Sequence, residues 1–110
     1  MDTSISEPIN SNRDLEPRVR RANQILESII GSTSEKLTAK WRLKDDASGR
    51  LLVDLLLIDS TGASVEGEFK FGELTNDNLL LGKFYKIWGD LLQARSHQQL
   101  NQMSGKITDN

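Results

Sequence analysis

The stretch LLVDLLLIDSTG, residues 51–62, decides the fold of this chain. Its first eight positions carry a single polar side chain, that of Asp54, so a strand here is apolar on both of its faces. The Asp-Ser-Thr-Gly that follows is typical of a three-residue hairpin loop in which Gly62 adopts the left-handed conformation. We therefore predict a strand that turns back directly into a second one.

The segments on either side of this stretch alternate between apolar and polar residues. Residues 37–44 read LTAKWRLK and residues 63–71 read ASVEGEFKF. Alternation of this kind indicates a strand with one buried face and one polar face. The sequence therefore predicts three consecutive strands, of which the middle one is the most apolar.

The two turns predict how the strands pair. The loop at 59–62 places Leu57 opposite Val65, and along both strands apolar residues then face apolar residues. For the first hairpin, whose turn is DDASG, we expect Leu43 opposite Leu51. The three strands then form an antiparallel meander.

Helical periodicity occurs on both sides of the strands. Apolar residues recur every three or four positions between Asp14 and Gly31, and again from Thr75 to about Leu100. Asp14 and Thr75 are typical N-cap residues. The predicted fold class is thus α+β, with the element order α-β-β-β-α and a three-stranded antiparallel meander packed with two amphipathic helices.

The length of 110 residues and the composition, 36% hydrophobic and 27% charged, are typical of one globular domain. We expect flexible tails at 1–13 and 104–110, because both are polar, and a single domain at 14–103. The chain has no cysteine and no apolar run of membrane-spanning length, so we expect a cytoplasmic protein without a membrane segment.

Even-numbered residues of the three strands share the face that points away from the predicted core. There, three aliphatic side chains surround Asp54, between a basic strand and a mostly acidic one. Exposed apolar surface of this kind usually marks an interface, so we predict contact with a protein partner or a second copy. The candidate interface residues are Lys40, Arg42, Leu52, Asp54, Leu56, Ile58, Glu66 and Glu68. Two alternatives stay open: long cationic side chains cover the face, or the two helices lie on opposite faces.

No motif in the sequence groups a nucleophile, a base and an acid. The only histidine, His97, lies among polar residues without an activating carboxylate beside it, and DDASG lacks the closing glutamate of a calcium loop. We therefore expect a non-enzymatic protein without cofactor or metal. Gly82 and Gly89, seven residues apart on the polar face of the second helix, are a weaker indication of contact with another backbone.

The order α-β-β-β-α is similar to that of the double-stranded-RNA-binding domain, a resemblance in topology alone. In that family, lysines at the start of the second helix bind phosphates, whereas this chain has Asp77 there, so no RNA-contacting residue carries over. The net charge of -2 gives no support for nucleic-acid binding. As an alternative function, a local basic surface could bind nucleic acid through Arg18, Arg20, Arg21, Lys40, Arg42 and Lys44.

Overall fold

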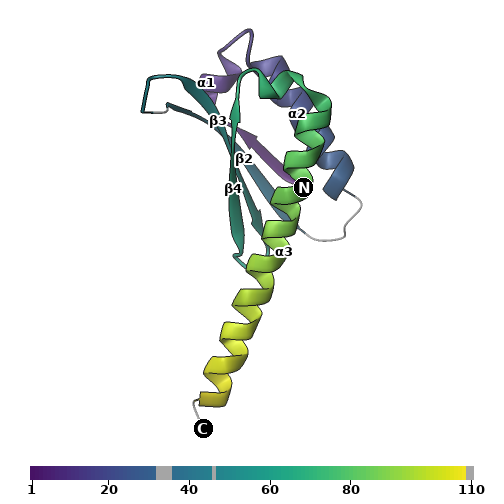
Figure 1. The fold of residues 1–110 in the computed structure, drawn as a ribbon, viewed down its shortest axis with the longest axis vertical. Helices are drawn as coiled ribbons and strands as arrows, with labels where there is room; N and C mark the ends of the chain where they lie inside the picture. Colours follow the sequence, from purple (N-terminus) through teal and green to yellow (C-terminus); the bar gives the residue numbers. More distant parts are fainter. Residues whose placement is uncertain (32–35, 46, 109–110) are drawn as a thin grey trace.

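Two helices pack against one face of a four-stranded sheet in the computed structural model (Figure 1). The structure describes residues 1–31, 36–45 and 47–108, with side chains as far as His97. Its elements in chain order are β1 (Asp2–Ile5), α1 (Glu7–Asn10), α2 (Glu16–Ile30), β2 (Leu37–Asp45), β3 (Leu51–Asp59), β4 (Ser64–Lys70), a 3-10 turn η1 (Glu73–Thr75) and α3 (Asp77–Thr108). The predicted α+β class is confirmed.

The sheet has one strand more than the predicted meander. Its order is β1-β2-β3-β4, and β1 runs parallel to β2 whereas the other neighbours are antiparallel. The prediction of a purely antiparallel three-stranded sheet is therefore correct only for β2, β3 and β4. A parallel pair requires a crossover connection, and α2 provides it between β1 and β2.

The predicted register is confirmed for the second hairpin and wrong for the first. Leu57 pairs with Val65 as expected, and Gly62 has a φ of 90°, the left-handed conformation that the loop requires. In the first hairpin, however, Leu43 pairs with Val53 instead of Leu51. Because the shift is by two residues, every side chain remains on its predicted face.

The two long helices begin at different caps from those predicted. Leu15 occupies the N-cap position of α2 without a side-chain cap, and in the turn before it the amides of Asp14 and Leu15 donate to the side-chain oxygen of Asn12, at 3.1 and 3.0 Å. At α3, the amide of Leu79 donates to the side-chain oxygen of Asn76 at 3.1 Å. Asparagine is as suitable an N-cap as aspartate or threonine, and several such residues lie near the start of each helix. The sequence pattern therefore predicted where each helix begins only to within a few residues.

Aromatic rings from the sheet and α3 form the centre of the core. Trp41 of β2 lies 5.9 Å from Phe69 of β4 and 6.3 Å from Phe84 of α3, measured between ring centroids. All three side chains are buried, and aliphatic residues of α2 and β3 surround them. The second tryptophan, Trp88, lies at the edge of the core and is only partly buried.

Two residues that the alternation assigns to the core are exposed. Leu51 is 50% exposed and Phe71 is 43% exposed, at the end of the sheet where the β2–β3 hairpin bends away from the helices (Figure 1). The guanidinium of Arg18 lies 4.4 Å from the centre of the Phe71 ring. A cation–π contact thus replaces the expected burial of this ring.

The ends of the chain also differ from the expected tails. Residues 1–13 contain β1 and α1, and the side chain of Ile9 is fully buried. At the other end, α3 continues through most of 104–110 and stops at Thr108, beyond the end of the sheet (Figure 1). Residues 109–110 lie outside the described part of the chain.

Candidate functional site

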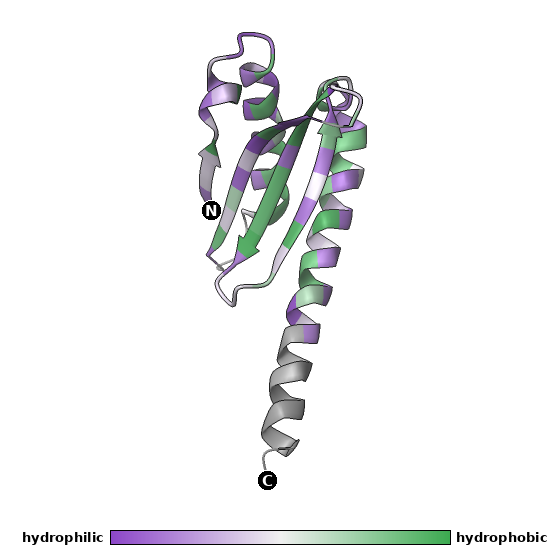
Figure 2. Ribbon diagram, turned by 90° about the vertical axis from the view of Figure 1, so that its left-hand side faces the viewer, coloured by the Kyte–Doolittle hydropathy of each residue, from purple (hydrophilic) through white to green (hydrophobic). Residues whose placement is uncertain are grey.

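The face of the sheet opposite the helices carries the candidate site, and we call it the open face. Figure 2 views this side: α2 lies behind the strands, α3 runs beside β4 along one edge of the sheet, and β3 is apolar along most of its length. The alternative with one helix on each face is thereby excluded. All predicted interface residues lie together here: Lys40, Arg42, Leu52, Asp54, Leu56, Ile58, Glu66 and Glu68.

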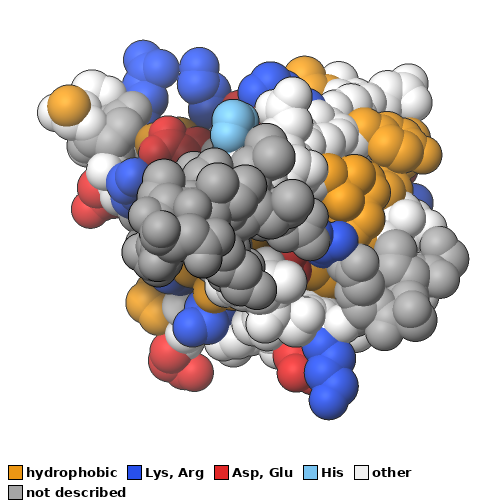
Figure 3. All heavy atoms as spheres, turned by 90° about the horizontal axis from the view of Figure 1, so that it is seen from below, with side chains coloured by type: hydrophobic (Ala, Val, Ile, Leu, Met, Phe, Trp, Pro, Cys, Tyr) orange, Lys and Arg blue, Asp and Glu red, His pale blue; other side chains and the backbone are white. Residues whose placement is uncertain are grey.

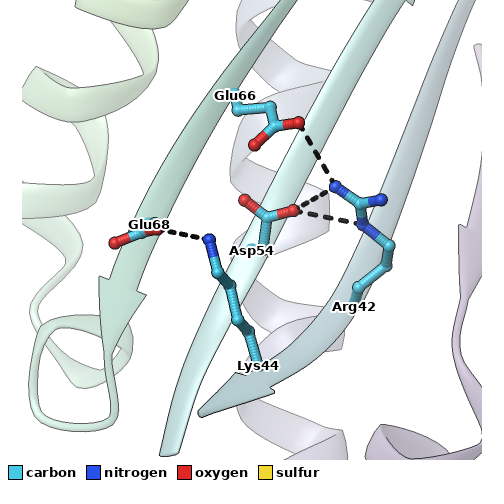
Figure 4. Close-up of polar contacts among 5 residues, drawn as sticks. All are labelled: Arg42, Lys44, Asp54, Glu66 and Glu68. Atoms are coloured by element: carbon cyan, nitrogen blue, oxygen red, sulfur yellow. Dashed lines mark hydrogen bonds and ion pairs between the residues drawn. The ribbon is translucent and has the colours of Figure 1, made fainter. Parts of the chain in front are cut away.

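Asp54 lies at the centre of the open face. Only 2% of its side chain is exposed, although no helix covers it. Its Oδ2 accepts hydrogen bonds from the guanidinium of Arg42, from Nε at 3.1 Å and also from Nη2 (Figure 4). The register expected for the first hairpin, with Leu43 opposite Leu51, sets Lys40 opposite Asp54, but the two-residue shift places Arg42 there instead.

Glutamates of β4 complete the charged cluster. Glu66 lies 3.5 Å from Nη2 of Arg42, and Glu68 lies 2.9 Å from Nζ of Lys44. Hydrogen bonding to Asp54 raises the pKa of Arg42, and hydrogen bonding to Glu68 raises the pKa of Lys44. Lys44 was not among the predicted interface residues. Strand alternation places it on the same face as Lys40 and Arg42, so the sequence contained the information needed to include it.

The apolar residues of the open face do not form one continuous stripe. Leu56 and Ile58 lie on one side of Asp54 and Leu52 on the other, and all three are partly buried. The cross-strand row formed by Arg42, Asp54 and Glu68 separates them. The long charged side chains therefore cover part of the apolar surface, as one of the alternatives predicted.

One atom of Asp54 is left without a partner. Its Oδ1 is buried, and it accepts no hydrogen bond from any residue that the structure describes. A shallow hollow of about 370 Å³ lies over Asp54, lined by Arg42, Leu43, Lys44 and Glu66. Because a buried carboxylate oxygen without a donor costs free energy, this position favours a group that brings an N–H or O–H donor.

The acidic side chains and the histidine that bear on metal binding can be placed in the described part of the chain. No three His, Cys, Asp or Glu residues there are grouped closely enough to hold a metal ion. His97 is exposed on α3, away from the strands that carry the charged cluster. Asp54 and the two glutamates are paired with Arg42 or Lys44, so none of these carboxylates is positioned as an isolated general base.

The basic residues of the nucleic-acid alternative are divided between two sides of the sheet. Arg20 and Arg21 lie on α2, where they pair with Glu16 and Asp77, whereas Arg42 and Lys44 lie on the open face. The view from below likewise shows basic side chains at separate places, interspersed with acidic ones (Figure 3). No single basic surface forms from this set.

The chain matches no family of known proteins, no curated protein and no solved structure. Among the described residues, no helix combines the length and the apolar character needed to cross a membrane. The function must therefore be inferred from the geometry of the open face.

Proposed function

We propose that this chain is a small, non-enzymatic interaction module that binds a protein partner through the open face. The observation that carries the proposal is the buried Oδ1 of Asp54, which lacks a donor on a sheet face that no helix covers. Partly buried leucines on both sides of it supply apolar contact area. The absence of cysteine fits a reducing compartment, and a cytoplasmic location is part of the proposal.

The partner that fits this face brings a hydrogen-bond donor between two apolar side chains. The donor would reach Oδ1 of Asp54 through the hollow once the long side chains that line it move aside, and the apolar groups would contact Leu52 and Leu56. Such an arrangement gives an apolar centre with a polar rim, which is the usual anatomy of a protein interface. Arg42, Lys44, Glu66 and Glu68 would then fix the orientation of the partner through their charges.

A second copy of the chain fits the open face less well than a different protein. The two-fold axis that sets the basic β2 against the acidic β4 of another copy runs along β3. It therefore places Asp54 against Asp54 of the second copy, and two buried carboxylates without donors oppose each other. For this reason we propose a different protein as the partner of this face.

The substitution Leu56→Glu tests the proposal. It places a charge among the apolar contacts of the open face, so we expect the affinity for a captured partner to fall at least about tenfold. The matched control is Leu51→Glu on the same strand, because Leu51 is 50% exposed at the end of the sheet and lies outside the open face. Partners are captured with the wild-type chain, and their affinities for the three proteins are compared by titration.

Circular dichroism on the same samples separates binding from folding. We expect both variants to keep the helical signal of the wild type. The proposal is overturned if Leu56→Glu unfolds the chain, because the open face would then be part of the core. It is also overturned if every captured protein binds Leu56→Glu as tightly as it binds Leu51→Glu.

A further inference from the structure

The outer face of α3 carries a row of residues that the described part of the chain leaves uncovered. Its members lie three or four positions apart, and we call them the α3 row: Asn78, Gly82, Tyr85, Gly89, Leu92 and Ser96. Tyr85 is 61% exposed and Leu92 is 40% exposed. A Cβ atom added at Gly82 or Gly89 would meet no atom within 4 Å.

This composition is unfavourable for a helix face in water. Glycine inside a helix destabilises it relative to alanine, and α3 has two glycines on this face without any contact that requires them. The exposed large side chains of the row, Tyr85 between the glycines and Leu92 after Gly89, lose the free energy that burial would supply. Small residues that alternate with large ones are, by contrast, suited to close packing against another helix.

We propose that α3 binds α3 of a second copy of this chain, with the two helices antiparallel along the α3 row. A two-fold axis at residue 87 places Tyr85 opposite Gly89 and Leu92 opposite Gly82. The same axis places Asn78 opposite Ser96. Each large side chain thus faces a glycine, and the polar residues at the two ends of the row face each other.

A parallel pair lacks this complementarity. It sets Tyr85 against Tyr85 and each glycine against its own counterpart, so the spacing that suits the tyrosines leaves gaps at the glycines. The antiparallel row extends over about 27 Å, from residue 78 to residue 96 at the helical rise. Figure 1 shows α3 on the outside of the molecule, where a second helix has access to it.

Charges beside the row agree with the same two-fold axis. Lys86 lies 3.3 Å from Asp90 of its own helix, and both residues flank the row. In the antiparallel pair, Lys86 also approaches Asp90 of the second copy, because the two positions lie close to the axis on the same side. Two cations and two carboxylates then alternate in one cluster.

The first test measures self-association of the full chain by light scattering over a concentration series. We expect a dimer that dissociates on dilution, and we expect Gly89→Gln to raise its dissociation constant at least about tenfold. Gly72→Gln is the matched control, because Gly72 is also exposed and an added Cβ there meets no atom within 4 Å. Since glutamine favours a helix more than glycine does, the melting temperature of dilute Gly89→Gln should equal or exceed that of the wild type.

The second test determines the orientation of the pair by disulfide formation. The chain has no cysteine, so Asn78→Cys and Ser96→Cys each introduce a single thiol at an exposed position. The antiparallel pair predicts a disulfide-linked dimer when the two variants are mixed and oxidised, and none when either is oxidised alone. Linked dimers from each variant alone would show a parallel pair and would overturn the proposed arrangement.

Comparing Gly89→Gln with Leu56→Glu shows whether the α3 proposal or the proposed function of the open face has failed. A monomer at every concentration, or a dimer that Gly89→Gln does not weaken, overturns the α3 proposal and leaves the open face untouched. A dimer that is lost in Leu56→Glu but kept in Gly89→Gln would place self-association on the open face. That result would contradict both the α3 proposal and the choice of a different protein as partner of the sheet.

Discussion

Among single residues, Asp59 contacts two parts of the chain that lie well apart in the sequence, the β3–β4 loop and α3. Its Oδ1 accepts hydrogen bonds from the amide of Thr61 at 2.9 Å and from the amide of Ala63 at 3.1 Å, which close the β3–β4 loop. Its Oδ2 lies 2.8 Å from Nε of Arg95 on α3. Burial alone would raise the pKa of the Asp59 carboxyl, but hydrogen bonds from Thr61 and Arg95 outweigh burial and lower it. One buried carboxylate thus joins the hairpin to the long helix.

This lowered pKa predicts a loss of stability in acid. Glu73, whose pKa is lowered by Lys83 and by the amide of Lys70 in spite of partial burial, acts in the same direction. Unfolded carboxyls have a pKa of about 4, so the unfolded state binds protons at a higher pH than the folded state does. Stability should be complete above about pH 5 and should fall as the pH drops through the lowered folded values. Urea unfolding between pH 7 and pH 2 measures this.

Asp59→Asn identifies the share of Asp59 in this pH dependence. The amide does not titrate, so the variant should be less stable than the wild type at pH 7 and should lose less stability between pH 5 and pH 2. Asp90→Asn is the control, because Asp90 belongs to an exposed pair within α3. An unchanged acid profile in Asp59→Asn would show that the Arg95 contact does not contribute to the pH dependence.

Among the elements, α3 packs closely against β4 at Gly67. A Cβ added at Gly67 would lie 2.5 Å from Cδ1 of Ile87, a buried residue of α3. The strand alternation had placed Gly67 between two core positions without a reason for glycine there. Close approach of the helix supplies that reason, because only a residue without a side chain leaves room for Ile87.

A double-mutant cycle tests this contact. Gly67→Ala should lower the free energy of unfolding by about 1–3 kcal/mol, because the added Cβ overpacks against the buried side chain of Ile87. Ile87→Val removes the Cδ1 atom, so the added cost of Gly67→Ala in that background should be clearly smaller. Chemical denaturation of the four proteins gives the coupling free energy. If the losses in free energy of unfolding caused by Gly67→Ala and Ile87→Val are additive, glycine is required at position 67 for a reason other than contact with Ile87.

The pairing of the strands shows what local sequence can and cannot predict. The four-residue turn with Gly62 in the left-handed conformation defines one register, so the β3–β4 hairpin was predicted correctly. The turn that ends β2 fits several loop lengths, and the prediction there was wrong by two residues. The face of each site residue was still correct because alternation has a period of two, but Asp54 was given Lys40 as its partner instead of Arg42.

For the whole molecule, the N-terminal segment was the main difference between expectation and structure. The polar composition of residues 1–13 predicts a tail, and a strand of four residues at the edge of a sheet gives no alternation long enough to recognise. The structure nevertheless buries Ile9 completely and pairs Ile5 with Trp41 in register. Contacts that depend on the tertiary fold have no signal in the local sequence.

Ile9→Ala tests whether residues 1–13 are part of the folded domain or form a flexible tail. If Ile9 is part of the core, the substitution should lower the free energy of unfolding by about 2–5 kcal/mol. If residues 1–13 were a flexible tail, the stability would not change. Pro8→Ala, at the exposed neighbouring position, is the control, and thermal and chemical unfolding of the three proteins provide the measurement.

The position of β1 has a consequence for synthesis on the ribosome. This strand is made before the other three strands of the described sheet, but the strand it pairs with, β2, follows after the whole of α2. The hairpins formed by β2, β3 and β4 join segments that are adjacent in the chain, so they close over short loops. Although β1 is made before the other three strands, it should therefore be the last of the four to join the sheet, and until then the outer edge of β2 is open to strands from other nascent chains.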